Sequence, residues 1–154
     1  MATEIERKFL VSDTAFLEKS EGEYLSQGYL SHTPESVVRV RIRGDEAFLT
    51  VKGITKGASR LEFEYPVPRE DAKEMLALCP EGKIEKTRHE IPLGKHVWEV
   101  DVFHGDNDGL IVAEIELGGE DEAFEKPDWL GEEVTGDPRY YNSNLSQTPF
   151  KSWA

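Results

Sequence analysis

Apolar and polar residues alternate along most of the chain, and this alternation predicts a mainly β structure. The stretch from Ser36 to Arg43 reads SVVRVRIR, with arginine at every second position and valine or isoleucine between. Successive side chains of a strand point to opposite faces, so this stretch predicts a strand with one charged and one apolar face. Segments of the same period predict about eight strands. They lie at 3–10, 24–31, 36–43, 47–53, 59–67, 83–91, 96–103 and 110–118.

Short turns between these segments predict that most neighbouring strands are antiparallel. Gly44-Asp45-Glu46 and Leu93-Gly94-Lys95 are two such turns. The best predicted helix runs from Pro68 to Leu78, with acids in its first turn and one apolar stripe. Weaker patterns predict three further helices, at 12–18, 120–126 and 137–146.

The charged faces of the predicted strands are sorted by sign. An ordinary wet outer face would mix Lys, Glu, Thr and Ser. Here three arginines share one face and pairs of glutamates share others, although like neighbours on a strand repel. Eight acids and eight bases lie on these faces: Glu4, Glu6, Lys8, Arg39, Arg41, Arg43, Lys52, Arg60, Glu62, Glu64, Lys86, Arg88, Glu99, Asp101, Glu114 and Glu116.

A polyanion bound together with divalent metal ions would compensate such faces. Arginine and lysine bind phosphate oxygens, and paired carboxylates bind Mg²⁺ or Mn²⁺. If the strands close into a barrel, the charged faces line a polar lumen and the apolar faces pack outward against helices. Burying so many charges in a dry interior would be costly, so we expect a wet lumen that binds a ligand.

Composition narrows the function classes. The chain has 154 residues and a formal net charge of −13, from 31 acids and 18 bases. Such an excess of acid argues against a general nucleic-acid footprint. One cysteine, Cys79, permits no internal disulfide, and the chain lacks an apolar signal or membrane-spanning run. We therefore expect one soluble cytoplasmic domain over residues 1–154, without a nucleic-acid or membrane partner.

The stretch Glu4-Ile5-Glu6-Arg7-Lys8 resembles the ExExK signature of the CYTH superfamily, the triphosphate tunnel metalloenzymes. The charged pairs that follow, through Glu116, occur in the order typical of that family. The chain is most similar to its short bacterial inorganic triphosphatase type. The resemblance implies an α+β, mainly β fold: an eight-stranded antiparallel closed β-barrel, or tunnel, with a charged lumen and flanking helices.

The resemblance also implies roles for the lumen residues. The residues expected to bind phosphate oxygens are Lys8, Arg39, Arg41, Lys52, Lys86 and Arg88. Those expected to bind two Mg²⁺ or Mn²⁺ ions are Glu4, Glu6, Glu114 and Glu116, with Glu62 or Glu64. Lys8 is also expected to be catalytic, paired with a tyrosine for which Tyr29 is the matching candidate and Tyr24 an alternative. No role follows for Arg43, Arg60, Glu99 and Asp101.

These expectations define one main function and its rivals. The main hypothesis is a hydrolase that splits the small molecule tripolyphosphate into pyrophosphate and phosphate. One rival class acts on an organic triphosphate, either as a class IV-type adenylate cyclase or as a nucleotide or thiamine triphosphate phosphohydrolase. A second rival is a polyphosphate-binding module without turnover. The sequence leaves the oligomeric state open, a homodimer included.

Overall fold

The strands predicted from the alternating pattern are present in the computed structural model, which describes residues 3–33 and 35–153. All eight predicted segments are strands, with ends that differ by at most a few residues, and a short ninth strand follows them. Their bounds are β1 Thr3–Val11, β2 Gly22–His32, β3 Ser36–Arg43, β4 Glu46–Gly53, β5 Ser59–Pro66, β6 Ile84–Leu93, β7 His96–Phe103, β8 Ile111–Glu116 and β9 Leu130–Glu133.

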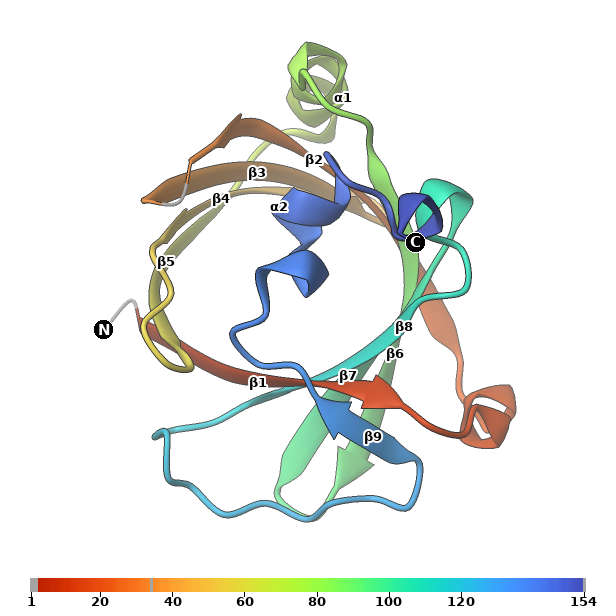
Figure 1. The fold of residues 1–154 in the computed structure, drawn as a ribbon. Coiled ribbons are helices and arrows are strands. Elements are labelled where there is room, and N and C mark those ends of the chain that lie inside the picture. Colours follow the sequence, from red (N-terminus) through yellow and green to blue (C-terminus); the bar gives the residue numbers. More distant parts are fainter. Residues whose placement is uncertain (1–2, 34, 154) are drawn as a thin grey trace.

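Eight of these strands close into an antiparallel barrel (Figure 1). The order around the sheet is β5-β4-β3-β2-β6-β7-β8-β1, and β1 returns to β5. The closing contact is short, because Thr3 to Ile5 pair with Ser59 to Leu61. The unpredicted β9 adds to β1 outside the ring. The prediction of a closed, mainly β barrel is therefore confirmed.

Helical segments are few and short. The predicted helix at 68–78 is present as α1, Arg69–Leu78, and the predicted helix at 12–18 is the 3₁₀ turn η1, Ala15–Lys19. The prediction at 137–146 corresponds to η3, Pro138–Tyr140, and α2, Asn142–Leu145. Two further 3₁₀ turns are η2, Gly105–Asn107, and η4, Phe150–Ser152. None of the helices in the described part of the chain has the length and apolar character needed to cross a membrane.

The helix predicted at 120–126 is wrong. This segment has a turn at Glu120–Asp121 and is otherwise irregular. Its extended course lets the ring of Phe124 pack edge-on against Phe9 and Trp98, with centroids 6.1 Å and 5.8 Å apart. Packing of one aromatic side chain onto the barrel thus outweighs the weak local preference for a helix.

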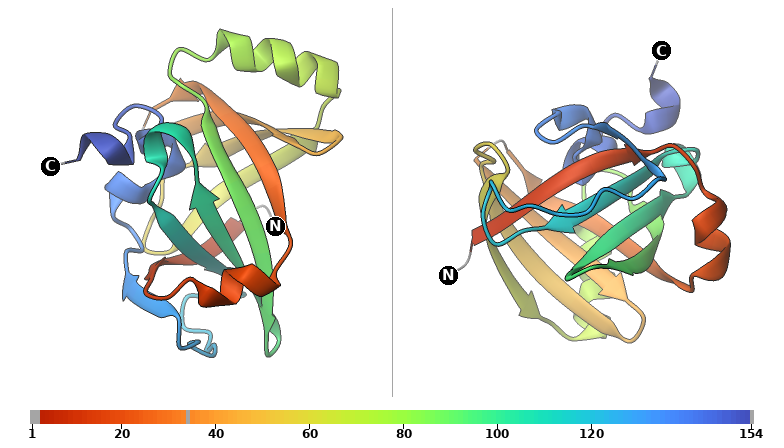
Figure 2. Two further views of the ribbon diagram at one scale, coloured as in Figure 1. Left: turned by 90° about the vertical axis from the view of Figure 1, so that its right-hand side faces the viewer. Right: turned by 90° about the horizontal axis from the view of Figure 1, so that it is seen from below.

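Helix α1 lies across the outside of the barrel, over β2, β3 and β4 (Figure 2). Its buried Ala72 packs against Val40 and Ala47. Gly28 on β2 allows this close approach, because a Cβ atom at Gly28 would lie 2.7 Å from Cys79 Sγ. The outward apolar face of the strands therefore forms a core with the helix, as the alternating pattern predicts.

The inward faces change from charged to apolar at one end of the barrel. There the apolar side chains meet Val134, Tyr140 and Leu145 of the C-terminal segment in one buried cluster. Figure 1 shows α2 inside the outline of the ring, and this segment closes that end of the lumen. The inward members of the cluster are Leu10, Tyr29, Val37, Ile84, Phe103 and Val112. The lumen is therefore charged over only part of its length, which the sequence analysis did not anticipate.

The close contact at Gly28 gives a test of the packing. We expect Gly28→Val to lower the free energy of unfolding by about 1–3 kcal/mol, because the new side chain overpacks the space held by Cys79 and Leu76. The matched control is Gly82→Val, since no atom lies within 4 Å of a Cβ built at Gly82. Urea unfolding of both variants measures the difference. Equal stability of the two variants would contradict the packing of α1 described above.

Candidate active site

A polar cavity of about 250 Å³ occupies the charged part of the lumen. Apart from the alternative tyrosine Tyr24, every residue for which the sequence analysis predicts a role lies on its wall: Glu4, Glu6, Lys8, Tyr29, Arg39, Arg41, Lys52, Glu62, Glu64, Lys86, Arg88, Glu114 and Glu116. These residues come from β1 to β6 and β8, so the closed barrel brings together positions that lie far apart in the sequence.

One side of the cavity is basic. The buried Arg39 donates from Nη2 to Thr50 Oγ1 at 3.1 Å and to Glu64 Oε2 at 3.4 Å. Next to it, Arg41 donates from Nε to Gln27 Oε1 at 2.8 Å. Burial, with the nearby charges of Arg39 and Arg88, lowers the pKa of Arg41 to about 9. The cations of this wall are thus crowded, and an anion in the cavity would relieve their repulsion.

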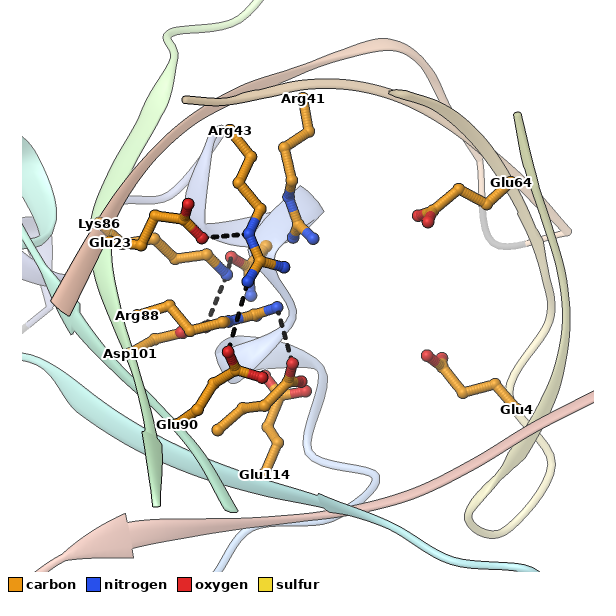
Figure 3. A network of polar contacts seen from close by, with 12 residues as sticks. Glu4, Glu23, Arg41, Arg43, Glu64, Lys86, Arg88, Glu90, Asp101 and Glu114 are labelled. Atoms are coloured by element: carbon orange, nitrogen blue, oxygen red, sulfur yellow. Dashed lines mark hydrogen bonds and ion pairs between the residues drawn. The ribbon is translucent and has the colours of Figure 1, made fainter. Parts of the chain in front are cut away.

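Lys86 and Arg88 extend the basic side on β6. Both are bonded to Asp101 of β7, which lies behind them (Figure 3). Burial, together with the charges of Arg88 and Arg41, lowers the pKa of Lys86 to about 7, although Asp101 acts in the other direction. Figure 3 shows Glu4 and Glu64 on the far side of the lumen from this cluster.

Carboxylates of β1 and β5 form the opposite side, whereas Glu114 of β8 lies near Arg88 (Figure 3). Lys52 Nζ lies between two of them, 3.4 Å from Glu4 Oε1 and 3.2 Å from Glu62 Oε2. Burial, followed by the nearby carboxylates of Glu114 and Glu4, raises the pKa of Glu6 well above its usual range. This wall holds more negative charge than its neighbours neutralise, and a cation would stabilise it.

The same carboxylates fit a divalent ion that is completed by other ligands. Within residues 3–33 and 35–153, no three Asp, Glu, His or Cys side chains converge closely enough to hold a metal ion on their own. Magnesium seldom uses such a cage, because it binds through one or two carboxylates, water and substrate phosphates. The crowded oxygen donors around Glu6 suit that mode of binding.

The ammonium of Lys8 lies at the edge of the C-terminal segment. Its Nζ donates to the carbonyl oxygen of Tyr140 at 3.2 Å and lies 4.0 Å from Glu114 Oε1. It is also 5.5 Å from the ring centroid of Tyr141. The segment that closes the barrel therefore also orients the lysine of the ExExK motif.

The two candidate tyrosines occupy different sides of the sheet. Tyr29 is buried on the cavity wall, where its hydroxyl accepts a hydrogen bond from Gln27 Nε2 at 3.0 Å. Tyr24 is half exposed and stacks on His104, with centroids 6.4 Å apart. It borders a separate groove beneath α1 and does not line the lumen. Of the two, Tyr29 alone is positioned to face a ligand in the cavity.

Sequence reasoning missed the neutral residues of the site. Gln27 is fully buried between Arg41 and Tyr29, and Tyr141, Asn142 and Ser143 line the cavity from the C-terminal segment. Gln27 lies two residues from Tyr29 on the same strand face, and this spacing was the available signal. The three C-terminal residues follow no strand period, so their place depends on how the segment folds back into the barrel.

Comparison with known proteins identifies the family. The family model of the CYTH domain matches residues 2–147, nearly the whole chain. The chain belongs to the CYTH domain family. This assignment agrees with the ExExK stretch and with the closed barrel. Membership of the CYTH family implies a requirement for a divalent metal ion.

Two relatives and one solved structure resemble the chain over most of its length. An inorganic triphosphatase of Acetivibrio thermocellus is 49% identical and covers 99% of both chains. An inorganic triphosphatase of Nitrosomonas europaea is 42% identical, covering 94% of this chain and 97% of the relative. The crystal structure of the inorganic triphosphatase NE1496 superimposes with a TM-score of 0.64 at 35% identity, over 92% of this chain and 96% of that one.

The crowded carboxylates predict a gain of stability when one is neutralised. Since its pKa is raised, ionised Glu6 destabilises the folded protein once the pH exceeds the glutamate pKa of the unfolded chain. We expect Glu6→Gln to raise the melting temperature of metal-free protein at pH 8 by roughly 2–4 °C, as for about 1 kcal/mol in a domain of this size. The gain should vanish near pH 4, where Glu6 is protonated in both states.

Thermal melts in a chelator measure this effect, with the exposed Glu46→Gln as the control for a change of net charge. Adding Mg²⁺ should then stabilise the wild type more than Glu6→Gln. A lower melting temperature of Glu6→Gln at pH 8 would show that Glu6 is not under repulsion.

Proposed function

We propose that this chain is a metal-dependent inorganic triphosphatase that hydrolyses tripolyphosphate to pyrophosphate and phosphate, as one domain over residues 1–154. One observation carries the proposal. The cavity of about 250 Å³ has cations on one side and crowded carboxylates on the other. A linear triphosphate with its metal ions has the complementary charges. The two relatives that are 49% and 42% identical, both inorganic triphosphatases, support the same substrate class.

The basic side holds the phosphate chain in this proposal. Arg39 and Arg41 of β3 offer forked guanidinium donors, whereas Lys86 offers a point charge. Lys52 offers a second point charge from the opposite side, where it lies between Glu4 and Glu62. Arg88 keeps its Nη1 atom, 3.3 Å from Glu99, on the cavity side. Most of the catalytic effect comes from positioning the phosphates and stabilising their developing charge.

The acidic side holds the metal. Glu4, Glu6, Glu114 and Glu116 are the proposed ligands of two Mg²⁺ or Mn²⁺ ions. When bound, the ions neutralise phosphate charge and orient the substrate. The choice between the two β5 glutamates favours Glu62, because Glu62 shares Lys52 with Glu4, whereas Glu64 pairs with Arg39 and Thr50.

Lys8 and Tyr29 act on the attacking water in this scheme. The Lys8 ammonium is fixed by the Tyr140 carbonyl at the closed end of the lumen, and it is the proposed contact of the terminal phosphate or of the water. No hydrogen bond joins Lys8 to Tyr29 among the described residues, so a water or phosphate oxygen between them would complete the pair.

The cytoplasmic location also stays a prediction.

A substrate panel tests the proposed function. We expect rapid phosphate release from tripolyphosphate with Mg²⁺ or Mn²⁺, slower release from ATP, GTP and thiamine triphosphate, and complete loss of activity in a chelator. Cyclic AMP is measured in the ATP reactions. Its appearance would identify a cyclase, and metal-dependent binding of tripolyphosphate without turnover would identify a binding module.

The Lys8→Ala variant tests the catalytic centre. Removing an ammonium that acts on the reacting groups should lower kcat for tripolyphosphate by on the order of 10²-fold or more. The control is Lys19→Ala, an exposed lysine of η1 far from the lumen, which should keep full activity. Circular dichroism checks that both variants fold. An unchanged kcat in Lys8→Ala would remove Lys8 from the catalytic centre.

A further inference from the structure

Among the inward-facing carboxylates that the structure describes, Asp101 stands out because both of its oxygens are paired with cations. It is completely buried on β7, directly opposite Arg88 of β6 in the sheet. Its Oδ1 accepts from Arg88 Nε at 2.8 Å, and its Oδ2 accepts from Arg88 Nη2 at 2.9 Å and from Lys86 Nζ at 2.7 Å. Both oxygens face these positive charges, so a metal ion in the lumen has no electrostatically favourable approach to Asp101.

The bonds to Asp101 determine which donors remain for a ligand. An ammonium has three N–H donors. Lys86 uses one for Asp101 and one for Asn142 Oδ1, at 2.8 Å. Among residues 3–33 and 35–153 the third has no hydrogen-bond partner, so it is left for the cavity that Lys86 lines. Arg88 binds Asp101 through Nε and Nη2, and its Nη1 donates one N–H to Glu99 Oε2 at 3.3 Å, which leaves the second Nη1 N–H for the cavity that Arg88 lines. Asp101 therefore aims one donor group of each cation at the lumen.

Neutral residues extend this arrangement to strands β2 and β3 and to α2. Asn142, the first residue of α2, also accepts from Gln27 Nε2 at 3.3 Å. Gln27 Oε1 in turn accepts from Arg41 Nε at 2.8 Å. Hydrogen bonds from Asp101 through Lys86, Asn142 and Gln27 to Arg41, with Arg88 bound to Asp101, connect three cations of the cavity wall.

We propose that Asp101 is a positioning residue for the triphosphate site: it is the shared counter-ion that keeps Lys86 and Arg88 charged and correctly oriented, with Asn142 as the neutral partner of Lys86. The proposal deepens the triphosphatase function and rests on it. Asp101 acts through the two cations, and it binds neither metal nor phosphate itself.

The charge of Lys86 depends on this counter-ion. Arg88 on the same strand and Arg41 on β3 disfavour its protonation, as burial does, and the resulting pKa is about 7. Two carboxylates favour the protonated form of Lys86: Asp101 on β7, in direct contact, and the more remote Glu114 on β8. Without the Asp101 charge, Lys86 should lose its proton at lower pH, and an uncharged amine binds phosphate weakly.

The test compares Asp101→Asn with the wild type and with Glu99→Gln. Glu99 is the next acid on the same strand face and also contacts Arg88, but it is more exposed. For Asp101→Asn we expect KM for tripolyphosphate to rise at least tenfold near pH 6, below the Lys86 pKa of about 7, while kcat falls less. We also expect the loss of kcat/KM with rising pH to begin at lower pH. Glu99→Gln should change KM less than about threefold. Absence of wild-type turnover would refute the proposed function itself.

A second substitution gives Lys86 a new carboxylate partner at the position of Asn142. In the Asp101→Asn background, Asn142→Asp places a carboxylate at the position that lies 2.8 Å from Lys86 Nζ. We expect this double variant to regain part of the wild-type pH profile. If Asp101→Asn does not fold, the single variant Asn142→Asp tests the proposal. Lys86 then has a second carboxylate partner besides Asp101, and the loss of kcat/KM with rising pH should move to higher pH. An unchanged profile would overturn the proposal.

A direct titration separates the inference from catalysis. The ¹³Cε resonance of Lys86, followed by NMR in substrate-free protein, should titrate at lower pH in Asp101→Asn and at higher pH in Asn142→Asp. This measurement does not depend on turnover. Identical titration in all three proteins would overturn the role of Asp101. So would a rise in the Mg²⁺ concentration for half-maximal activity at unchanged KM, which would make Asp101 a metal ligand.

Discussion

The structure depends on placing many charges of both signs inside a closed barrel. A buried charge is tolerated only where partners offset its loss of water. Asp101 shows the extreme case, since it is fully buried and held by Lys86 and Arg88. Although burial opposes ionisation, these two cations hold the pKa of Asp101 well below its usual range. Around Glu6 the compensation is incomplete, and that is where a cation has most to contribute.

The inward faces of the barrel have an apolar zone and a charged zone, one after the other along the barrel axis. At one end, inward residues such as Phe103 and Val112 form an ordinary apolar core with Leu145 of the C-terminal segment. Towards the other end, the same strand faces carry the charged cavity. The apolar end anchors the segment that supplies the carbonyl of Tyr140 to Lys8 and the amide of Asn142 to Lys86. The apolar zone of the inward surface thus stabilises the fold, and the charged zone forms the candidate active site.

Much of the fold and of the site was predictable from the period of the pattern. A repeat of two residues places Arg39 and Arg41 on one face wherever the strand lies, and closure of the sheet makes that face a lumen. The helix at 120–126 was mispredicted because Phe124 packs onto the barrel. Strand β9 was missed because its pairing with β1 is a tertiary contact.

The sequence by itself determined which residues face inward, the sign of the charge on each strand face and the resemblance to CYTH proteins, since these follow from local spacing and residue type. The tertiary structure decided which of the charges meet. The β6–β7 register sets Arg88 opposite Asp101 and makes that acid a counter-ion. The return of the C-terminal segment brings Asn142 to Lys86 across 56 residues. Spacing along a strand cannot specify such contacts, because they depend on register and barrel closure.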